Sequence, residues 1–429
     1  MTAPAAMPAP APVPSAPAAS LLPEPFPYQR RIVEYLKAEE RGLWEWLTSA
    51  KLRAEQAGAA RLELLKTTYR LEPEKHPDLH ALVAEVGAAL GVAAPATVYQ
   101  AEGAGGPNAS LFHLPGEIHL VLAGPLLATL SGDELRAVIA HEVAHFALFE
   151  GFDGEMRAAD QALAALAALP RAEPAHVASA RLHRLYVELY CDRAALPVVK
   201  DPLVAVAALI KTTTGLRDAS AESYLRQAAE ILDRAEVRTE GVSHPESFIR
   251  ARALELFAAR GPAADAEIAR LVEGSPVLDE LDLLAQQRLT RLTRRIVERL
   301  LAPAWMRTPA LLGHARHFFA DLEPGAAPPP DAPDGSDPAA GAGPPLADPA
   351  GIVHPSIQDY LAFVLLDFAA ADPELEEAPL ALAHLLAERL GMAERFRALA
   401  QKELKLKKRT VERLAREAAR MVAEASTAR

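Results

Sequence analysis

Cysteine, aromatic residues and long hydrophobic runs are scarce in this sequence. Its 429 residues include one cysteine, Cys191, which excludes a disulfide framework within one chain and fits a reducing compartment. Aromatic residues make up 5% of the chain although half of its residues are hydrophobic, a composition typical of a mostly helical protein. The most apolar stretch outside helical patterns, residues 118–130, is shorter than the roughly 18–20 residues of a membrane span. We therefore expect no transmembrane segment.

Positive charge is also in short supply. The formal net charge is −12 and the isoelectric point lies near 5.6, which argues against binding to nucleic acid because that requires a basic surface. No basic region precedes the first apolar residues, so residues 1–27 do not have the form of a secretory signal. These features predict a cytoplasmic protein.

Proline divides the chain into parts. Residues 1–27 and 321–350 each contain nine of the 36 prolines, and such segments bury too little apolar area to offset the entropy of ordering. We predict a disordered leader over residues 1–27 and a linker over residues 321–353. The linker separates a body, residues 28–320, from a small all-α domain, residues 354–429. The length of the chain is consistent with two or three domains.

Short strand patterns lie between helical patterns in the body. Residues 97–101, 110–114 and 117–122 are β-like and are separated by turns rich in glycine and proline. The sequence Ser131-Gly132-Asp133-Glu134 has the form of a capping box, which predicts that a helix begins there. Helices, a small sheet and further helices follow one another, so we predict a mostly helical α+β fold.

The helix that begins after Ser131 contains the sequence His141-Glu142-Val143-Ala144-His145. Histidines four residues apart lie one above the other on a helix, so both imidazoles can bind one zinc ion. A catalytic zinc needs three protein ligands and an open position, where it activates a water molecule. Glu142 is the candidate general base that takes the proton from this water.

A third ligand must come from elsewhere in the chain. Leu148 and Gly151 occupy the positions where a metzincin would have glycine and histidine, so that class is excluded. On a helix predicted over residues 181–196, Glu188 and Asp192 share one face, so that Glu188 can bind zinc while Asp192 orients a histidine. His176 and His183 remain rival ligands. Cys191, between these carboxylates, is either a redox-active thiol or a small buried residue.

Together these motifs resemble a known family. Asn108-Ala109, the strand at 117–122, His141 to His145, the motif at 188–193, His244-Pro245 and Arg250 are similar in order to gluzincin metallopeptidases of the HtpX and CAAX prenyl protease type, metallopeptidase family forty-eight. The resemblance covers residues 78–257. It implies one zinc per chain bound by His141, His145 and Glu188, with Glu142 as the base.

The same resemblance assigns further roles. It implies that Asp192 and Arg250 support the ligands, that His244 stabilises the oxyanion, and that the strand at Asn108 and Ala109 pairs with an extended peptide. Alternatives remain, because His244 and Asn108 also suit turns and Arg252 competes with Arg250 for the supporting role. Family members commonly span membranes, whereas charged residues between the two motifs exclude a span there.

The C-terminal segment has apolar residues at helical spacing around an acidic turn, residues 372–379. It resembles TerB-like helical domains, and we predict a partner-binding accessory domain. The acidic residues could bind a divalent cation or could stabilise the positive end of a helix dipole where a helix begins. The basic residues 402–409 are typical of the solvated face of a helix.

The sequence thus predicts a zinc-dependent metalloendopeptidase that acts on a protein or peptide. The alternatives are a zinc hydrolase with another substrate and a catalytically silent zinc-binding scaffold whose helical tail recruits partners.

Overall fold

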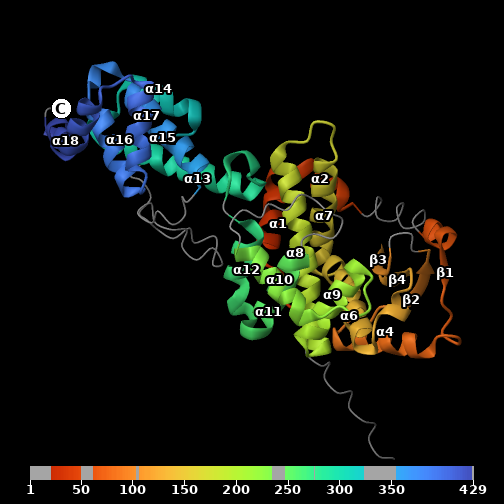
Figure 1. Ribbon diagram of the computed structural model, residues 1–429. Helices are drawn as coiled ribbons and strands as arrows, with labels where there is room; N and C mark the ends of the chain where they lie inside the picture. The colour runs from red at the N-terminus through yellow and green to blue at the C-terminus, as the bar shows by residue number, and fades with distance from the viewer. Residues whose placement is uncertain are drawn as a thin grey trace, which may run out of the picture. The chain divides into compact units, whose positions relative to one another are not determined.

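The computed structural model describes residues 21–49, 61–102, 106–233, 247–274, 276–322 and 354–427. Within these ranges the protein is a mostly helical α+β structure, as the sequence predicts, with one small sheet near its N-terminus (Figure 1). The chain divides into two compact units, and each is described by itself. Most residues of the leader and linker, 1–20 and 323–353, lie outside the described residues.

The sheet belongs to the first unit, which comprises residues 1–26, 41–159 and 184–268. Its four strands have the order β1-β2-β4-β3. The strands β3 and β4 form an antiparallel hairpin, whereas β2 runs parallel to β4 and β1 runs antiparallel to β2. Their bounds are β1 Thr68–Arg70, β2 Ala96–Ala101, β3 Asn108–Leu114 and β4 Glu117–Ala123. Three of them match the predicted strands, and β1 was not predicted.

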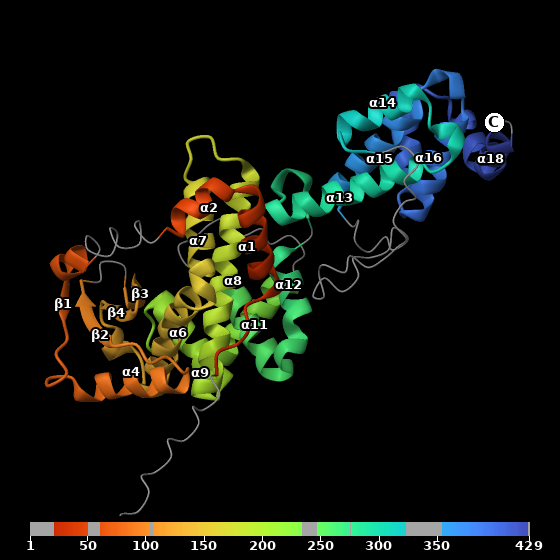
Figure 2. The same ribbon diagram turned by 180° about the vertical axis from the view of Figure 1, so that it is seen from behind.

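One face of the sheet is covered by the helices α4 (Pro77–Ala89) and α6 (Gly132–Glu150), which lie beside the strands in both views (Figure 2). Inward-facing residues of β2 and β4, such as Val98 and Leu120, pack against Val83 of α4 and Val143 of α6. Burial of this apolar surface fixes the rotation of α6 about its axis and therefore determines which of its residues face away from the sheet.

The capping box at the start of α6 forms as predicted. The backbone N–H of Ser131 donates to Glu134 Oε2 at 2.8 Å, and the Ser131 hydroxyl accepts from the backbone N–H of Glu134 at 3.4 Å. Glu134 also pairs with Lys211 of α9 (Pro202–Thr214), whose Nζ lies 2.8 Å from Glu134 Oε1. Three contacts therefore hold the first turn of the histidine-bearing helix.

Removing this cap should weaken the fold measurably. We expect Ser131→Ala to lower the free energy of unfolding by about 1 kcal/mol, because a donor at the helix start loses its acceptor. Urea denaturation followed by circular dichroism measures this loss. Ser223→Ala, at an exposed position of α10 (Ala221–Asp233), is the control and should change stability by less than about 0.5 kcal/mol. Equal effects of the two substitutions would contradict the assigned cap.

The helices after α6 complete the first unit. Apolar residues of α9, α10 and α11, including Val206, Ala221 and Leu254, form a separate small core with Leu196 of α8. The remaining helices of this part of the chain, three of which continue into the second unit, are α2 Arg41–Leu47, α5 Leu126–Thr129, α7 Glu155–Ala167, α8 Pro174–Val199, α11 Ser247–Arg260 and α12 Asp265–Glu273.

The second unit comprises residues 27–40, 160–183 and 269–429. Helices on both sides of the predicted linker share one core, in which Val297 and Leu311 belong to the same cluster as Leu365 and Phe396. The helices of this unit are α1 Pro27–Glu39, α13 Leu283–Leu300, α14 Pro309–Phe318, α15 Pro355–Ala370, α16 Ala378–Arg389, α17 Ala393–Glu403 and α18 Lys408–Thr427. The domain boundaries and the TerB-like resemblance stay predictions.

Among the residues that the structure describes, no helix combines the length and the hydropathy that a membrane span requires.

Candidate metal centre

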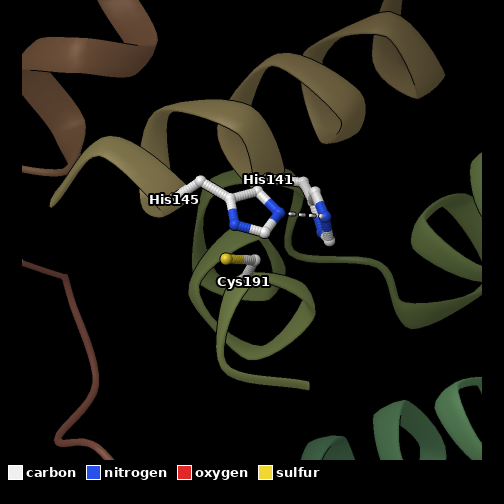
Figure 3. Close-up of side chains that lie close together, drawn as sticks. All are labelled: His141, His145 and Cys191. Carbon is white, nitrogen blue, oxygen red and sulfur yellow. Dashed lines mark hydrogen bonds between the residues drawn. The ribbon is translucent and has the colours of Figure 1, made fainter. Parts of the chain in front are cut away.

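The two histidines of α6 face the same space. His141 and His145 are separated by one helical turn, and their Nε2 atoms lie 3.2 Å apart (Figure 3). Both side chains are largely buried, with 13% and 14% of their surface exposed. The predicted spacing therefore brings two imidazole nitrogens close enough to bind the same ion.

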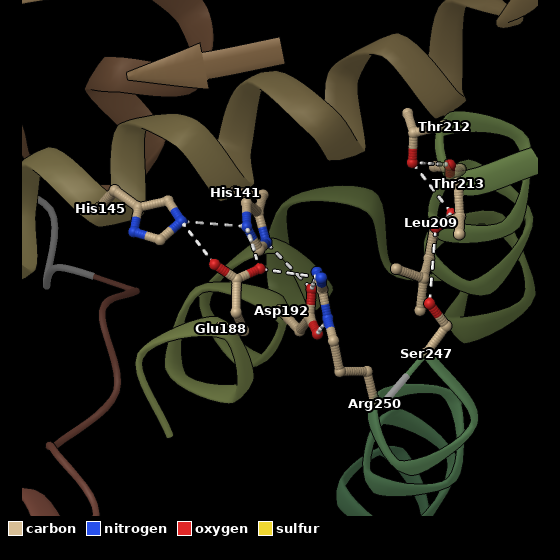
Figure 4. Close-up of polar contacts among 10 residues, drawn as sticks. His141, His145, Glu188, Asp192, Leu209, Thr212, Thr213, Ser247 and Arg250 are labelled. Carbon is tan, nitrogen blue, oxygen red and sulfur yellow. Dashed lines mark hydrogen bonds and ion pairs between the residues drawn. The ribbon is translucent and has the colours of Figure 1, made fainter. Parts of the chain in front are cut away.

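Helix α8 adds a carboxylate to this pair. Glu188 Oε2 lies 3.5 Å from His141 Nε2, and Glu188 Oε1 lies 3.5 Å from His145 Nε2 (Figure 4). Donors that surround zinc tetrahedrally at about 2.0–2.1 Å are separated from one another by about 3.3 Å. The separations in this site are 3.2 Å between the two imidazoles and 3.5 Å from each imidazole to one of the two Glu188 oxygens. They are close to that spacing, so the residues fit a zinc ion.

Asp192 lies one turn after Glu188 on α8. Its Oδ1 atom is 2.9 Å from His141 Nδ1, on the opposite side of the ring from the nitrogen that faces His145. A carboxylate bound to one ring nitrogen fixes the orientation of the imidazole and leaves the other nitrogen for a metal. The contact is the one expected of a group that orients a histidine ligand.

Arg250 of α11 holds both carboxylates of α8. Its Nε and Nη2 atoms each donate to Asp192 at 2.7 Å, and its Nη1 lies 2.8 Å from Glu188 Oε2. The Arg250 side chain is buried, whereas the rival Arg252 is more exposed and pairs with Glu255 on its own helix. The structure therefore brings Arg250, not Arg252, to the carboxylates.

Loss of this buried guanidinium should be costly. We expect Arg250→Met to lower the free energy of unfolding of the metal-free protein by about 3–5 kcal/mol, because two buried carboxylates lose their common partner. The measurement is again urea denaturation. Arg252→Met is the matched control on the same helix and should change stability by less than about 0.5 kcal/mol. If both variants unfold at the same urea concentration, Arg250 does not support the site.

The buried charges alter how the groups of the site ionise. Burial by itself would lower the pKa of His141, but the hydrogen bonds to Asp192 and Glu188 together with their negative charges raise this pKa to about 10. Burial lowers the pKa of His145 to about 4. Burial works against ionisation of Glu188, yet the Arg250 charge keeps its pKa well below the usual range.

Glu142 lies next to the first histidine but is not one of the three clustered donors. The residue is buried, and burial raises the pKa of its carboxyl. A hydrogen bond with the backbone of Leu111, in β3, opposes this shift. A carboxyl whose pKa is raised above its ordinary value holds a proton more readily, which suits a group that accepts a proton and later returns it.

The strand β3 lies at an edge of the sheet, since β4 is its only neighbour in the strand order of the described residues. Asn108 and Ala109 are the first two residues of β3 and pair with Ala123 and Leu122 of β4. The opposite side of β3 has backbone groups that do not pair within this sheet. An edge strand of this kind can add an extended peptide as a further strand.

Cys191 is a neighbour that the sequence motif did not explain. Its Sγ, one ring nitrogen of His141 and one of His145 all lie within 4.8 Å of one another (Figure 3). The thiol is fully buried, and burial raises its pKa well above the ordinary value. In the sequence, only the position of Cys191 between Glu188 and Asp192 indicates that it lies near the histidines.

His244 and Pro245 lie outside the described residues, so the predicted oxyanion role of His244 stays a prediction. His176 and His183 lie on α8 more than one helical turn before Glu188. At Gly151, the metzincin position, an added Cβ would lie 2.7 Å from the backbone oxygen of Ala147, which explains why a histidine ligand does not fit there.

Comparisons with known proteins agree with these features. Residues 73–257 match the family described as Peptidase family M48. A curated relative, the plastoglobule-localized metallopeptidase 48 of Arabidopsis thaliana chloroplasts, is 28% identical over 215 residues, which is 45% of this chain and 60% of the relative's length. No solved structure matches the chain. The family match confirms the resemblance that the motifs predicted.

Proposed function

We propose, from the peptidase family M48 domain that this chain carries, that the protein is a zinc-dependent metalloendopeptidase with Glu142 as general base. The observation that carries the proposal is the spacing of His141, His145 and Glu188, whose donor atoms lie 3.2–3.5 Å apart. The family match supports a metallopeptidase in general, and the donor spacing supports zinc as its metal.

A zinc ion held by these three side chains would polarise the scissile carbonyl and lower the pKa of a water molecule to about 7. Glu142 accepts the proton of the attacking water and delivers it to the leaving amine. Asp192 fixes the His141 ring, and Arg250 keeps the two carboxylates of α8 ionised and in place. His244 has the proposed role of stabilising the oxyanion.

The substrate is proposed to be an extended segment of protein or peptide. β3 is an edge strand, and it begins with Asn108 and Ala109, so its unpaired side offers main-chain groups to a peptide strand. Leu111, in the same strand, forms a backbone hydrogen bond with Glu142, so this edge lies next to the proposed catalytic carboxylate. A peptide bound along β3 would therefore pass close to the metal centre.

The experiment is cleavage of a mixed peptide library by the zinc-loaded full chain, with products identified by mass spectrometry. Internal cleavage that stops after chelation and returns with zinc is the expected result. Removal of single terminal residues would point to an exopeptidase, and no cleavage by the zinc-loaded chain would favour the catalytically silent scaffold.

The accessory role of residues 354–429 is also a proposal. These helices share a core with α13 and α14, so a deletion at the linker would expose the residues packed there. A search for protein partners should therefore use the full chain. The cytoplasmic location is an expectation from the sequence alone.

A further inference from the structure

Cys191 is the only cysteine of the chain, and its sulfur lies at the metal centre. Sγ is within 4.8 Å of a ring nitrogen of both His141 and His145, and Figure 3 shows it beside the two rings. Because Cys191 follows Glu188 by three residues on α8, the two side chains project from the same face of the helix. A soft sulfur donor and a hard oxygen donor therefore stand next to the same imidazole pair.

We propose that Cys191 is a further metal donor, whose thiolate binds a thiophilic divalent cation together with His141, His145 and Glu188. This inference rests on the proposed metal centre and extends it. Thiolate donors bind soft ions preferentially, whereas carboxylate and imidazole donors bind zinc well. When the sulfur–metal bond forms, the thiol proton passes to bulk water, so the step needs neither an oxidant nor a reductant.

The consequence is a site with two coordination states. Around zinc, three protein donors leave a position for water, which is the arrangement of a catalytic centre. Around a softer ion such as Cd²⁺, the Cys191 thiolate fills the fourth position, which is the arrangement of a closed site. The same side chains thus provide an open centre for one ion and a closed centre for another. Cys191 therefore increases the affinity of the site for soft ions, but it takes no part in catalysis by the zinc-bound form.

Absorption spectroscopy of the Cd²⁺-loaded full chain tests this directly. Bonding of cadmium to a thiolate gives a charge-transfer band in the ultraviolet, and with one cysteine in the sequence any such band belongs to Cys191. We expect the band to grow with added CdCl₂ and to level off at about one ion per chain. The Glu142→Gln variant should show the same band, since Glu142 is not a donor.

The affinities of the Cys191→Ala variant provide a second readout. We expect the ratio of Cd²⁺ to Zn²⁺ affinity, measured by competition with a chelating dye, to fall about 10-fold relative to the wild type. Full Cd²⁺ loading without the band, or an unchanged affinity ratio, would overturn the proposal while leaving the zinc centre intact. If the wild type bound neither ion, both this proposal and the proposed function would be overturned.

Discussion

Glu142→Gln is expected to lower kcat for peptide hydrolysis by about 10²–10⁴-fold while zinc stays bound. The amide keeps the size of the side chain but cannot accept the proton of the attacking water. Glu142 is not one of the three clustered donors, and its buried carboxyl contacts the backbone of Leu111 instead. We therefore expect zinc affinity to change by no more than a few-fold, as measured by metal competition, because the donor set is intact.

The control for this variant is Asp133→Asn, which removes an exposed carboxylate from the first turn of the same helix. Its kcat should remain within about two-fold of the wild type, because Asp133 lies more than two helical turns from Glu142. A Glu142→Gln variant that cleaves peptides as fast as this control would exclude Glu142 as the general base.

Glu188→Ala is expected to weaken zinc binding by more than about 100-fold, since groups that only support ligands already account for 10–100-fold. Glu188 supplies the oxygen donor beside both histidines, and its carboxylate is kept ionised by Arg250. The Glu188→Gln variant, which preserves shape but not charge, should lose less affinity than Glu188→Ala. Dialysis followed by elemental analysis of both variants gives the zinc content and the affinities.

This experiment also decides between the two donors on α8. If Cys191 rather than Glu188 were the third zinc ligand, Glu188→Ala would retain zinc and Cys191→Ala would lose it. We expect the reverse order of effects for zinc. Arg250 loses one of its two partners in Glu188→Ala. Circular dichroism of each variant therefore checks that the helical content, and with it the fold, is retained.

Features that depend on local sequence could be predicted well. The capping box at Ser131 determined where α6 begins, and the hairpin of β3 and β4 follows from two short apolar runs separated by Pro115 and Gly116. The histidine pair needs only a helix, because its spacing is a property of helical geometry. By contrast, β1 is three residues long and is stabilised by pairing with β2, so its own sequence carries little signal.

Features that depend on distant residues were harder to predict. Nothing in the local sequence shows which of Arg250 and Arg252 supports the site. Only the packing of α11 against its neighbours brings Arg250 to Asp192 and Glu188. The closeness of Cys191 to both imidazoles likewise depends on how α6 and α8 cross. The proline-rich composition of the linker carried no information about the core that α13 and α14 share with the helices after it.

X-ray absorption at the zinc edge of the zinc-loaded full chain tests the central claim most directly. The account predicts one zinc per chain with two imidazole nitrogens at about 2.0–2.1 Å and oxygen donors at about 2.0–2.2 Å. That result would establish an open centre built from His141, His145 and Glu188. A zinc ion enclosed by four protein donors, with sulfur at about 2.3 Å, or a chain that retains no zinc, would contradict it.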